Sequence, residues 1–423
     1  MNGLWLRRAG RRLCLRRPAW RLAVALAIAL PTVLAGCAST PAPTPTPHAA
    51  HDRAPRLHVQ GNQLADQHGR TVVLRGVNRI GGEYACTKLG RLWDGPMDQA
   101  SVTAMRRWGI NAVRIPLNSA CWNGASYVDD TVSGPAYRRA VRAYVELLDR
   151  NGLTPILDLH WTDGHYTGRD TQCTQLEAVC LKPMPDAAGA VPFWRSVAGT
   201  FKTNRAVVFD LFNEPYPDRA LADPAAGWRC WRDGGAACAP GIPGYRAAGM
   251  QTLLDAVRST GAANVVLAGG IAYANDLGEW LRYAPKDRRD NLAASWHAYD
   301  FSLCRTTACW DSDIAPVASK APVVVTEIGQ RGCRDTFLRP MLRHLATRAA
   351  GYLAWAWSTS GTCSSTPSLI TDYNGTPTSY GLGLKQHLTD LTTPSTGAVR
   401  TRHGDSGLDR SNGGQVKLLS VRA

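Results

Sequence analysis

The chain has 423 residues, of which 44% are hydrophobic, and its formal net charge is +15. This length excludes most small folds and suits either two average domains or one large α/β barrel, and the apolar content is sufficient for a full core. Seven arginines without an acid precede residue 22, so the rest of the chain carries +15 less 7, or +8. No basic helix interleaved with aromatic residues stands out, which excludes nucleic acid as a partner.

The first 36 residues have the pattern of a signal peptide. The arginines are followed by an apolar run, Leu22 to Leu34, which is too short to span a bilayer well. The next residues, up to Cys37, complete Leu-Ala-Gly-Cys, which resembles the lipobox of bacterial lipoproteins, where the cysteine becomes the lipidated N-terminus. We predict a lipoprotein signal peptide over residues 1–36 and a lipid on Cys37; a plain secretory signal or a transmembrane anchor are the alternatives.

Two polar segments flank the central region. Residues 37–55 are rich in Ala, Pro and Thr, with PAPTPTP at the centre, and predict an extended linker. Residues 391–423 contain Gly, Ser and Arg without a clear period, and predict a disordered or loosely attached tail. Residues 56–390 then form a single domain.

Cysteine usage also indicates export. Ten of the twelve cysteines lie outside the signal peptide and the lipobox, and an even number in an exported chain indicates disulfides. Cysteines close together in the sequence predict disulfides within single loops. We pair the remaining four, which lie far from one another in the sequence, in chain order, although the sequence alone does not fix that choice. The pairs are Cys173–Cys180, Cys230–Cys238, Cys304–Cys309, Cys86–Cys121 and Cys333–Cys363. No CxxC occurs, which makes structural zinc a poor alternative.

Eight short apolar runs alternate with helical patterns through the central region. Their β-branched composition is typical of strands buried on both faces, as in a parallel sheet. The runs are 72–78, 111–117, 153–160, 206–215, 263–270, 291–299, 322–329 and 351–357. Residues 137–151 and 243–260 each place apolar side chains on one helical face. Eight strands with helical crossovers predict an α/β fold, a (β/α)8 TIM barrel. An open doubly wound sheet is the runner-up, but no GxGxxG follows the first strand.

Polar and aromatic residues interrupt these runs near their carboxyl ends, where a barrel places its active site. They are Arg114 in the second run, His160 in the third, Asn213 and Glu214 in the fourth, His297 and Tyr299 in the sixth, Glu327 in the seventh and Trp357 in the eighth. One such residue usually has a structural or surface role. Six strands presenting such groups at one rim predict a functional site, because buried charges are costly without partners.

The two glutamates suit the cleavage of an acetal. That reaction needs a proton donor for the leaving oxygen and an anion that stabilises or traps the oxocarbenium-like carbon. Two carboxylates about 5–5.5 Å apart do this with retention of configuration, whereas a wider gap admits water and gives inversion. The fourth and seventh strands lie across the barrel mouth, so Glu214 and Glu327 are placed to face one bond. For Glu214 the alternative is a salt-bridged rim residue, which the Pro-flanked FNEP turn disfavours.

Val207–Tyr216, VVFDLFNEPY, resembles the signature of the family five glycoside hydrolases, the cellulase family. RGVNR, DGP and DYNGTP further resemble a branch common among exported bacterial enzymes, and the resemblance covers about residues 56–390. It implies retaining hydrolysis of β-glycosidic bonds, with Glu214 as the acid/base and Glu327, in TEIG, as the nucleophile.

The same resemblance implies roles for the residues around the glutamates. Asn213 contacts the sugar 2-hydroxyl, and Arg114 steadies the nucleophile. Trp357 floors the cleavage subsite, with Trp355 as the less favoured choice. His160, His297 and Tyr299 match the His and Tyr motifs of the family and would bind substrate. We expect Arg114 and Tyr299 to keep Glu327 ionised, and the neighbouring carboxylate to raise the pKa of Glu214 so that it holds a proton near neutral pH.

The resemblance alone suggests the substrate, a β-1,4-linked glucan cleaved in an endoglucanase-like manner. Mannans and other β-glycans are alternatives because the same motifs serve them, and the cysteine-stapled insertions 169–186 and 228–242 would line or block the cleft. Tryptophans at strand ends and in the following loops are candidate sugar platforms. They are Trp122, Trp161, Trp228, Trp231, Trp296 and Trp310.

Two other classes of protein compete with this interpretation. A non-catalytic glycan-binding barrel would lack one of the glutamates, and both are present. A metal-dependent hydrolase would need an HxH motif at the end of the first strand, where Asn78 stands. We expect no metal or other cofactor, a monomeric chain, a polysaccharide or oligosaccharide partner, and a location at the cell envelope, on the membrane through Cys37, or outside the cell.

Overall fold

A computed structural model of the chain describes residues 53–166, 173–238, 245–361, 363 and 367–392. The predicted signal peptide, Cys37, the linker up to residue 52 and the tail from residue 393 lie outside the described residues. Within the described ranges, no helix combines the length and the apolar character that crossing a membrane requires.

Eight parallel strands close into a barrel in the order β10-β11-β12-β3-β4-β5-β6-β9. In chain order they are β3 (Arg75–Asn78), β4 (Ala112–Asn118), β5 (Thr154–Trp161), β6 (Val208–Asp210), β9 (Val266–Gly269), β10 (Leu292–Tyr299), β11 (Val323–Gly329) and β12 (Gly351–Ala354). Each strand overlaps one of the eight apolar runs, so the predicted TIM barrel is confirmed.

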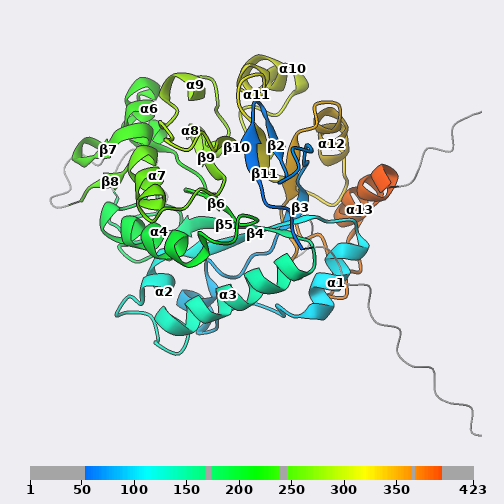
Figure 1. Ribbon diagram of the computed structural model, residues 1–423, viewed down its shortest axis with the longest axis horizontal. Coiled ribbons are helices and arrows are strands. Elements are labelled where there is room, and N and C mark those ends of the chain that lie inside the picture. The colour runs from blue at the N-terminus through cyan, green and yellow to red at the C-terminus, as the bar shows by residue number, and fades with distance from the viewer. Residues whose placement is uncertain (1–52, 167–172, 239–244, 362, 364–366, 393–423) are drawn as a thin grey trace, which may run out of the picture. The chain divides into compact units, whose positions relative to one another are not determined.

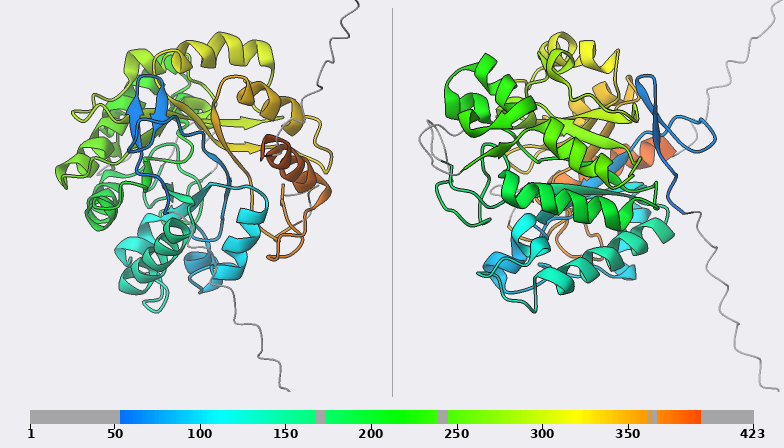
Figure 2. Two further views of the ribbon diagram at one scale, coloured as in Figure 1. Left: turned by 45° about the vertical axis from the view of Figure 1, so that its right-hand side comes forward. Right: turned by 60° about the vertical axis from the view of Figure 1, so that its left-hand side comes forward.

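Helices surround the strands of the barrel (Figures 1 and 2). The longer ones are α1 (Gln99–Arg107), α3 (Gly134–Arg150), α4 (Ala187–Phe201), α6 (Pro224–Asp233), α7 (Met250–Ser259), α12 (Leu338–Ala346) and α13 (Ser379–Thr392). Short helices lie in the connections: α2 (Ser119–Asn123), α5 (Pro217–Leu221), α8 (Ile271–Ala274), α9 (Trp280–Tyr283), α10 (Thr307–Cys309) and α11 (Ala315–Ala318).

The two predicted helices differ in how well their bounds agree with the structure. The helix expected over 137–151 is α3, and it buries Val141 and Leu148 because apolar residues recur on one face. The helix expected over 243–260 is α7 and begins only at Met250. The preceding residues instead form strand β8 (Ala247–Ala248), which pairs with β7 (Gly234–Gly235).

A hairpin that the sequence analysis did not predict closes the amino-terminal end of the barrel. Strands β1 (His58–Gln60) and β2 (Gln63–Ala65) pair antiparallel. Leu57 and Leu64, at this hairpin, pack against residues from the first halves of the barrel strands, such as Ala293 and Val324. Because this end is filled, the carboxyl end is left for a site, as in other barrels.

All five predicted disulfides are confirmed. They join Cys86 to Cys121, Cys173 to Cys180, Cys230 to Cys238, Cys304 to Cys309 and Cys333 to Cys363. The two distant pairs link segments that follow neighbouring strands: β3 and β4 in one case, β11 and β12 in the other. They therefore fasten loops together at the end of the barrel that carries the polar residues.

Candidate active site

A pocket opens at the carboxyl ends of the barrel strands. Its lining includes five of the residues singled out from the sequence, and its volume is about 690 Å³, in the range that encloses a substantial ligand. Those five are His160, Asn213, Glu214, Tyr299 and Glu327. Arg114 and His297 are buried behind this lining and contact it. Residues from β4, β5, β10 and β11, and from the segment that follows β6, thus meet at one place.

The two glutamates face each other across one imidazole nitrogen. His297 Nδ1 lies 2.9 Å from Glu214 Oε1 and 3.6 Å from Glu327 Oε2. One oxygen of each glutamate and a His297 ring nitrogen all lie within 4.8 Å of one another. This separation fits a carboxylate pair that acts directly on one carbon, and it is too small for the wider pair that holds a water molecule between its members.

Arg114 organises the floor of the site. Its guanidinium has five N–H donors, and five different side chains lie within 3.1 Å of its nitrogens. Nε donates to Asp210, Nη1 to Asn78 and Glu327, and Nη2 to Asn213 and contacts Asp158. A planar, always charged group therefore fixes Glu327 and Asn213 relative to each other.

Glu327 is held as an acceptor at both oxygens. Arg114 donates to Oε1 at 2.8 Å and the Tyr299 hydroxyl donates to Oε2 at 2.6 Å. Hydrogen bonds to an ionised carboxylate are about twice as strong as neutral ones, so both contacts favour the anion. Burial raises the pKa of Tyr299 well above its usual range, and the Glu327 charge adds to this effect, so the phenol keeps its proton.

Glu214 has the opposite environment. Burial raises its pKa to about 7, against opposing effects from His160 and Arg114. The main cause therefore differs from our sequence-based expectation, which attributed the shift to the neighbouring carboxylate. A carboxyl group with this pKa is protonated over a large part of the neutral range, as a general acid requires.

The two histidines are neutral. Burial lowers the pKa of His297 to about 3 and that of His160 to about 4. His160 Nδ1 lies 2.7 Å from Asp158 Oδ2, which orients its ring. Because both imidazoles are neutral, the net charge of the site depends on Arg114 and the carboxyl groups.

Two aspartates beneath the site were not singled out from the sequence. Asp158 and Asp210 are fully buried, pair in register between β5 and β6, and both contact Arg114. Burial raises the pKa of each to about 7, and Arg114 opposes this. The sequence did contain a signal for them, since each is an acid inside an otherwise apolar strand run. Side chains alternate along a strand, so Asp158 lies on the same face as His160 and could have been assigned to the site.

The expected role of Trp357 is wrong. Its side chain is fully buried and packs edge-on against Trp108, with ring centroids 5.0 Å apart. Trp355 lines the pocket instead and stacks on His160, with centroids 5.7 Å apart and planes 18° from parallel. The cause is the end of β12 at Ala354, three residues before the end of the predicted run, so Trp355 is the first residue beyond the strand.

Most of the candidate tryptophan platforms are core residues. Only Trp161 is partly exposed, and it lies beside Tyr84 with the Lys88 ammonium 4.6 Å from its ring. The buried ones are Trp122, Trp228, Trp231, Trp296 and Trp310. Position after a strand does not separate rim from core, because the segments that follow the strands form helices such as α2 and α6, which bury Trp122, Trp228 and Trp231.

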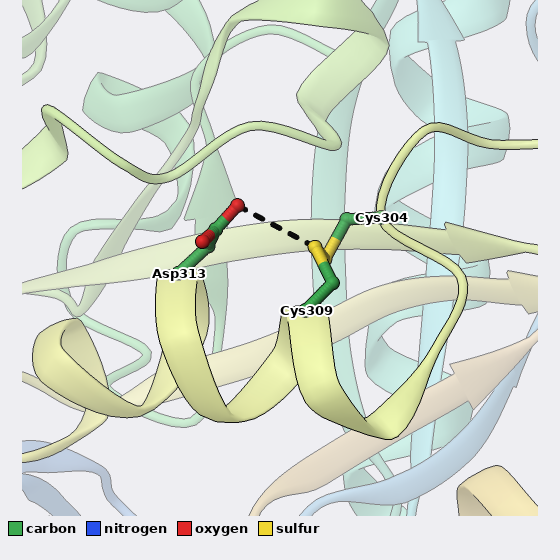
Figure 3. Close-up of side chains that lie close together, drawn as sticks. All are labelled: Cys304, Cys309 and Asp313. Atoms are coloured by element: carbon green, nitrogen blue, oxygen red, sulfur yellow. Dashed lines mark hydrogen bonds between the residues drawn. A yellow bond between two sulfur atoms is a disulfide. The ribbon is translucent and has the colours of Figure 1, made fainter.

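Two clusters in the described residues have the composition of a metal site. One is Glu214, His297 and Glu327, whose side chains are already engaged as above. The other is Cys304, Cys309 and Asp313 (Figure 3), in which the two sulfurs are bonded to each other. Disulfide sulfur is not a thiolate, so the second cluster lacks the ligands that a metal would need.

Similar proteins were found by sequence and by structure. A mannan endo-1,4-beta-mannosidase of Salipaludibacillus agaradhaerens is 24% identical over 361 residues, which are 84% of this chain and 94% of that protein. A beta-glucanase of Saccharophagus degradans aligns with a TM-score of 0.61 at 20% identity, covering 84% of this chain and 98% of that one. Its structure with bound cellotetraose aligns with the same TM-score of 0.61 at 19% identity and the same coverage, 84% and 98%.

A beta-mannanase of Streptomyces thermolilacinus aligns with a TM-score of 0.53 at 21% identity, covering 79% of this chain and 96% of that one. At these identities the solved structures show a shared fold. The model of the family described as Cellulase (glycosyl hydrolase family 5) matches residues 65–361, well over half of the sequence. With the barrel and the site described above, this match identifies the chain as a member of the cellulase family, glycosyl hydrolase family 5.

Proposed function

We propose that this glycoside hydrolase cleaves β-1,4-linked glucan or mannan with retention of configuration, using Glu327 as the nucleophile and Glu214 as the acid/base. One observation carries the proposal: the facing oxygens of the two glutamates lie within 4.8 Å of each other, with Glu327 stabilised as an anion and Glu214 in an environment that holds its proton. A carboxylate and a carboxylic acid at this distance suit a double displacement.

The reaction then proceeds in two steps, formation of a glycosyl-enzyme and its hydrolysis. Glu327 attacks the anomeric carbon and forms an ester bond to the sugar, while Glu214 gives its proton to the departing glycosidic oxygen. Glu214, now a carboxylate, takes a proton from a water molecule. The resulting hydroxide attacks the anomeric carbon, and the ester bond to Glu327 breaks. Asn213, fixed by Arg114 at 2.9 Å, is placed to hydrogen-bond a sugar hydroxyl during both steps.

The substrate is narrowed to a β-glycan by the family, and we favour β-1,4-linked glucan first and mannan second. The relatives support both choices, since their names include a beta-glucanase and two enzymes that act on mannan. Trp355 offers a ring beside the catalytic pair on which a pyranose face can stack. Hydrolysis assays on cellulose derivatives, lichenan, mannan and xylan would rank these substrates.

The stereochemical outcome tests the proposed mechanism. Proton NMR of the first-formed sugar should show the β-anomer before mutarotation, because two inversions give retention. Glu214→Gln and Glu327→Gln should each fold normally and lose activity by orders of magnitude. An α-anomer as the first product, or near-normal hydrolysis by either variant, would overturn the assignment.

We also propose that the chain is exported and anchored through a lipid on Cys37. The five disulfides support export, because such bonds persist in oxidising compartments. In a bacterial host, Cys37→Ala should move the protein from the membrane fraction to the soluble fraction and abolish incorporation of labelled fatty acid. Equal membrane association of both forms would count against the anchor.

A further inference from the structure

Two exposed apolar side chains stand at the mouth of the active-site pocket. Eight large hydrophobic side chains are exposed among the described residues, and only Phe301 and Leu303 of these line the pocket. Their exposed fractions are 50% and 72%. Exposed apolar groups clustered at a binding pocket indicate contact with a ligand, since leaving them in water is unfavourable.

The ring of Phe301 is held in place. It stacks on Tyr299, with ring centroids 5.0 Å apart and planes 26° from parallel, and the Arg331 guanidinium lies 4.4 Å from its centroid. Tyr299 in turn donates to Glu327. One aromatic contact therefore connects Phe301 to the side chain that orients the nucleophile, and little conformational freedom is lost when a ligand packs on it.

The loop that carries both side chains is fastened at each end. Asp300 accepts a hydrogen bond from the Arg331 backbone N–H at 3.0 Å. Cys304 donates its backbone N–H to the buried Asn275 side chain at 2.8 Å and is bonded to Cys309 in α10 (Figure 3). An apolar surface on a fastened loop can make a defined contact, whereas a mobile one would pay an ordering cost.

The position of this loop indicates which part of a glycan it meets. Around the barrel, β9 and β10 lie between β6, which precedes Glu214, and β11, which carries Glu327, whereas β12 and β5 lie on the other arc between these two strands. The opposite wall of the pocket carries the stacked Trp355 and His160 rings. In the proposed function the sugar beside the catalytic pair stacks on Trp355, so the leaving group lies on the other side of the two glutamates, which is the side of the 301–303 loop.

We infer that Phe301 and Leu303 form an apolar platform for the leaving-group sugar and so determine specificity on that side of the scissile bond. The inference rests on the proposed function and deepens it. A β-linked pyranose presents C–H groups on its face, and such a face packs on an aromatic ring and an aliphatic side chain. The platform would also hold the acceptor when the glycosyl-enzyme is transferred to a sugar in place of water.

Kinetics on two substrates with the same glycon test this role. In Phe301→Ala/Leu303→Ala, kcat/KM should fall about tenfold for a β-1,4-linked oligosaccharide that extends past the scissile bond, a size typical of losing a stacking contact. The aryl glycoside of that glycon, whose leaving group is not a sugar, should show a much smaller loss, and the share of product transferred to an added oligosaccharide acceptor should drop. Phe301→Trp, which keeps an aromatic ring and Leu303, should retain oligosaccharide cleavage.

Leu281→Ala is the matched control, because Leu281 is 46% exposed on α9 and does not line the pocket. Its kinetics should equal those of the wild type. Equal losses of the double variant on both substrates, or no loss on either, would overturn the platform. A wild-type enzyme inert on every β-glycan would instead refute the proposed function, so the two failures are distinguishable.

Discussion

Replacing Arg114 by lysine tests how the floor of the active site works. An ammonium has three donors where the guanidinium has five, so at least two of its five acceptors lose their partner. A hydrogen bond to a charged group contributes about 1.5–3 kcal/mol, so two lost bonds correspond to about 3–6 kcal/mol. This loss is divided between folding and the transition state. With half assigned to each, kcat/KM falls by about 10- to 100-fold.

The assay is hydrolysis of an aryl β-glycoside together with thermal unfolding followed by circular dichroism. Arg258→Lys provides the control, because Arg258 is an equally buried arginine that pairs with Asp287 away from the site. We expect Arg258→Lys to lower the melting temperature and leave kcat unchanged, whereas Arg114→Lys should lower both. Wild-type kcat/KM in Arg114→Lys would refute the claim that the guanidinium positions Glu327.

Three further results are expected. Above pH 7, kcat/KM should decline, because Glu214, with a pKa raised to about 7, is protonated below that pH and loses its proton above it; a pH–rate profile flat to pH 9 would contradict this. Trp355→Ala should reduce kcat/KM on oligosaccharides with little change in stability. Trp357→Ala should instead lower the unfolding free energy by about 3–5 kcal/mol, because that ring is fully buried. Urea titration and kinetics distinguish the two variants, and the reverse pattern would return Trp357 to the cleavage subsite. Replacing Cys86 and Cys121 by serine should lower the unfolding free energy by about 3–4 kcal/mol for a loop of 35 residues, and an unchanged urea midpoint would argue against this.

The barrel could be predicted because each strand is buried on both faces. A run such as 322–329 is apolar at nearly every position, and this continuous pattern is typical of parallel strands. The acids stood out against the same pattern, since Glu327 is one of the few charged groups in such runs. A buried charge needs partners, which indicated that other polar groups lie beside it. The start of α7 was predicted too early, since Ala247 and Ala248 pair with another strand and the helix begins only at Met250.

The tryptophan of the site could not be placed in the same way. Trp355 and Trp357 both follow an apolar run and share one strand parity, so alternation does not distinguish them. The end of β12 at Ala354 decides between them, and it depends on contacts with distant segments: Trp357 donates its backbone N–H to Asn78, and Ala356 donates to Pro367. Long-range contacts of this kind leave little trace in local composition.

The pairing of Asp158 and Asp210 beneath Arg114 also depends on the folded barrel. Each acid was visible in its own strand, but the register between β5 and β6 brings the two side by side. One guanidinium then faces these two carboxyl groups and Glu327. This charge balance follows from three-dimensional contacts and has no counterpart in sequence spacing.

Trapping the covalent intermediate tests the two-carboxylate mechanism most directly. A 2-deoxy-2-fluoro β-glycoside with an activated leaving group should inactivate the wild-type enzyme, and mass spectrometry of its peptides should find one sugar on Glu327. Glu327→Gln should remain unlabelled under the same conditions. A label on another residue, or turnover without any labelled peptide, would contradict the assignment of Glu327 as the nucleophile opposite Glu214.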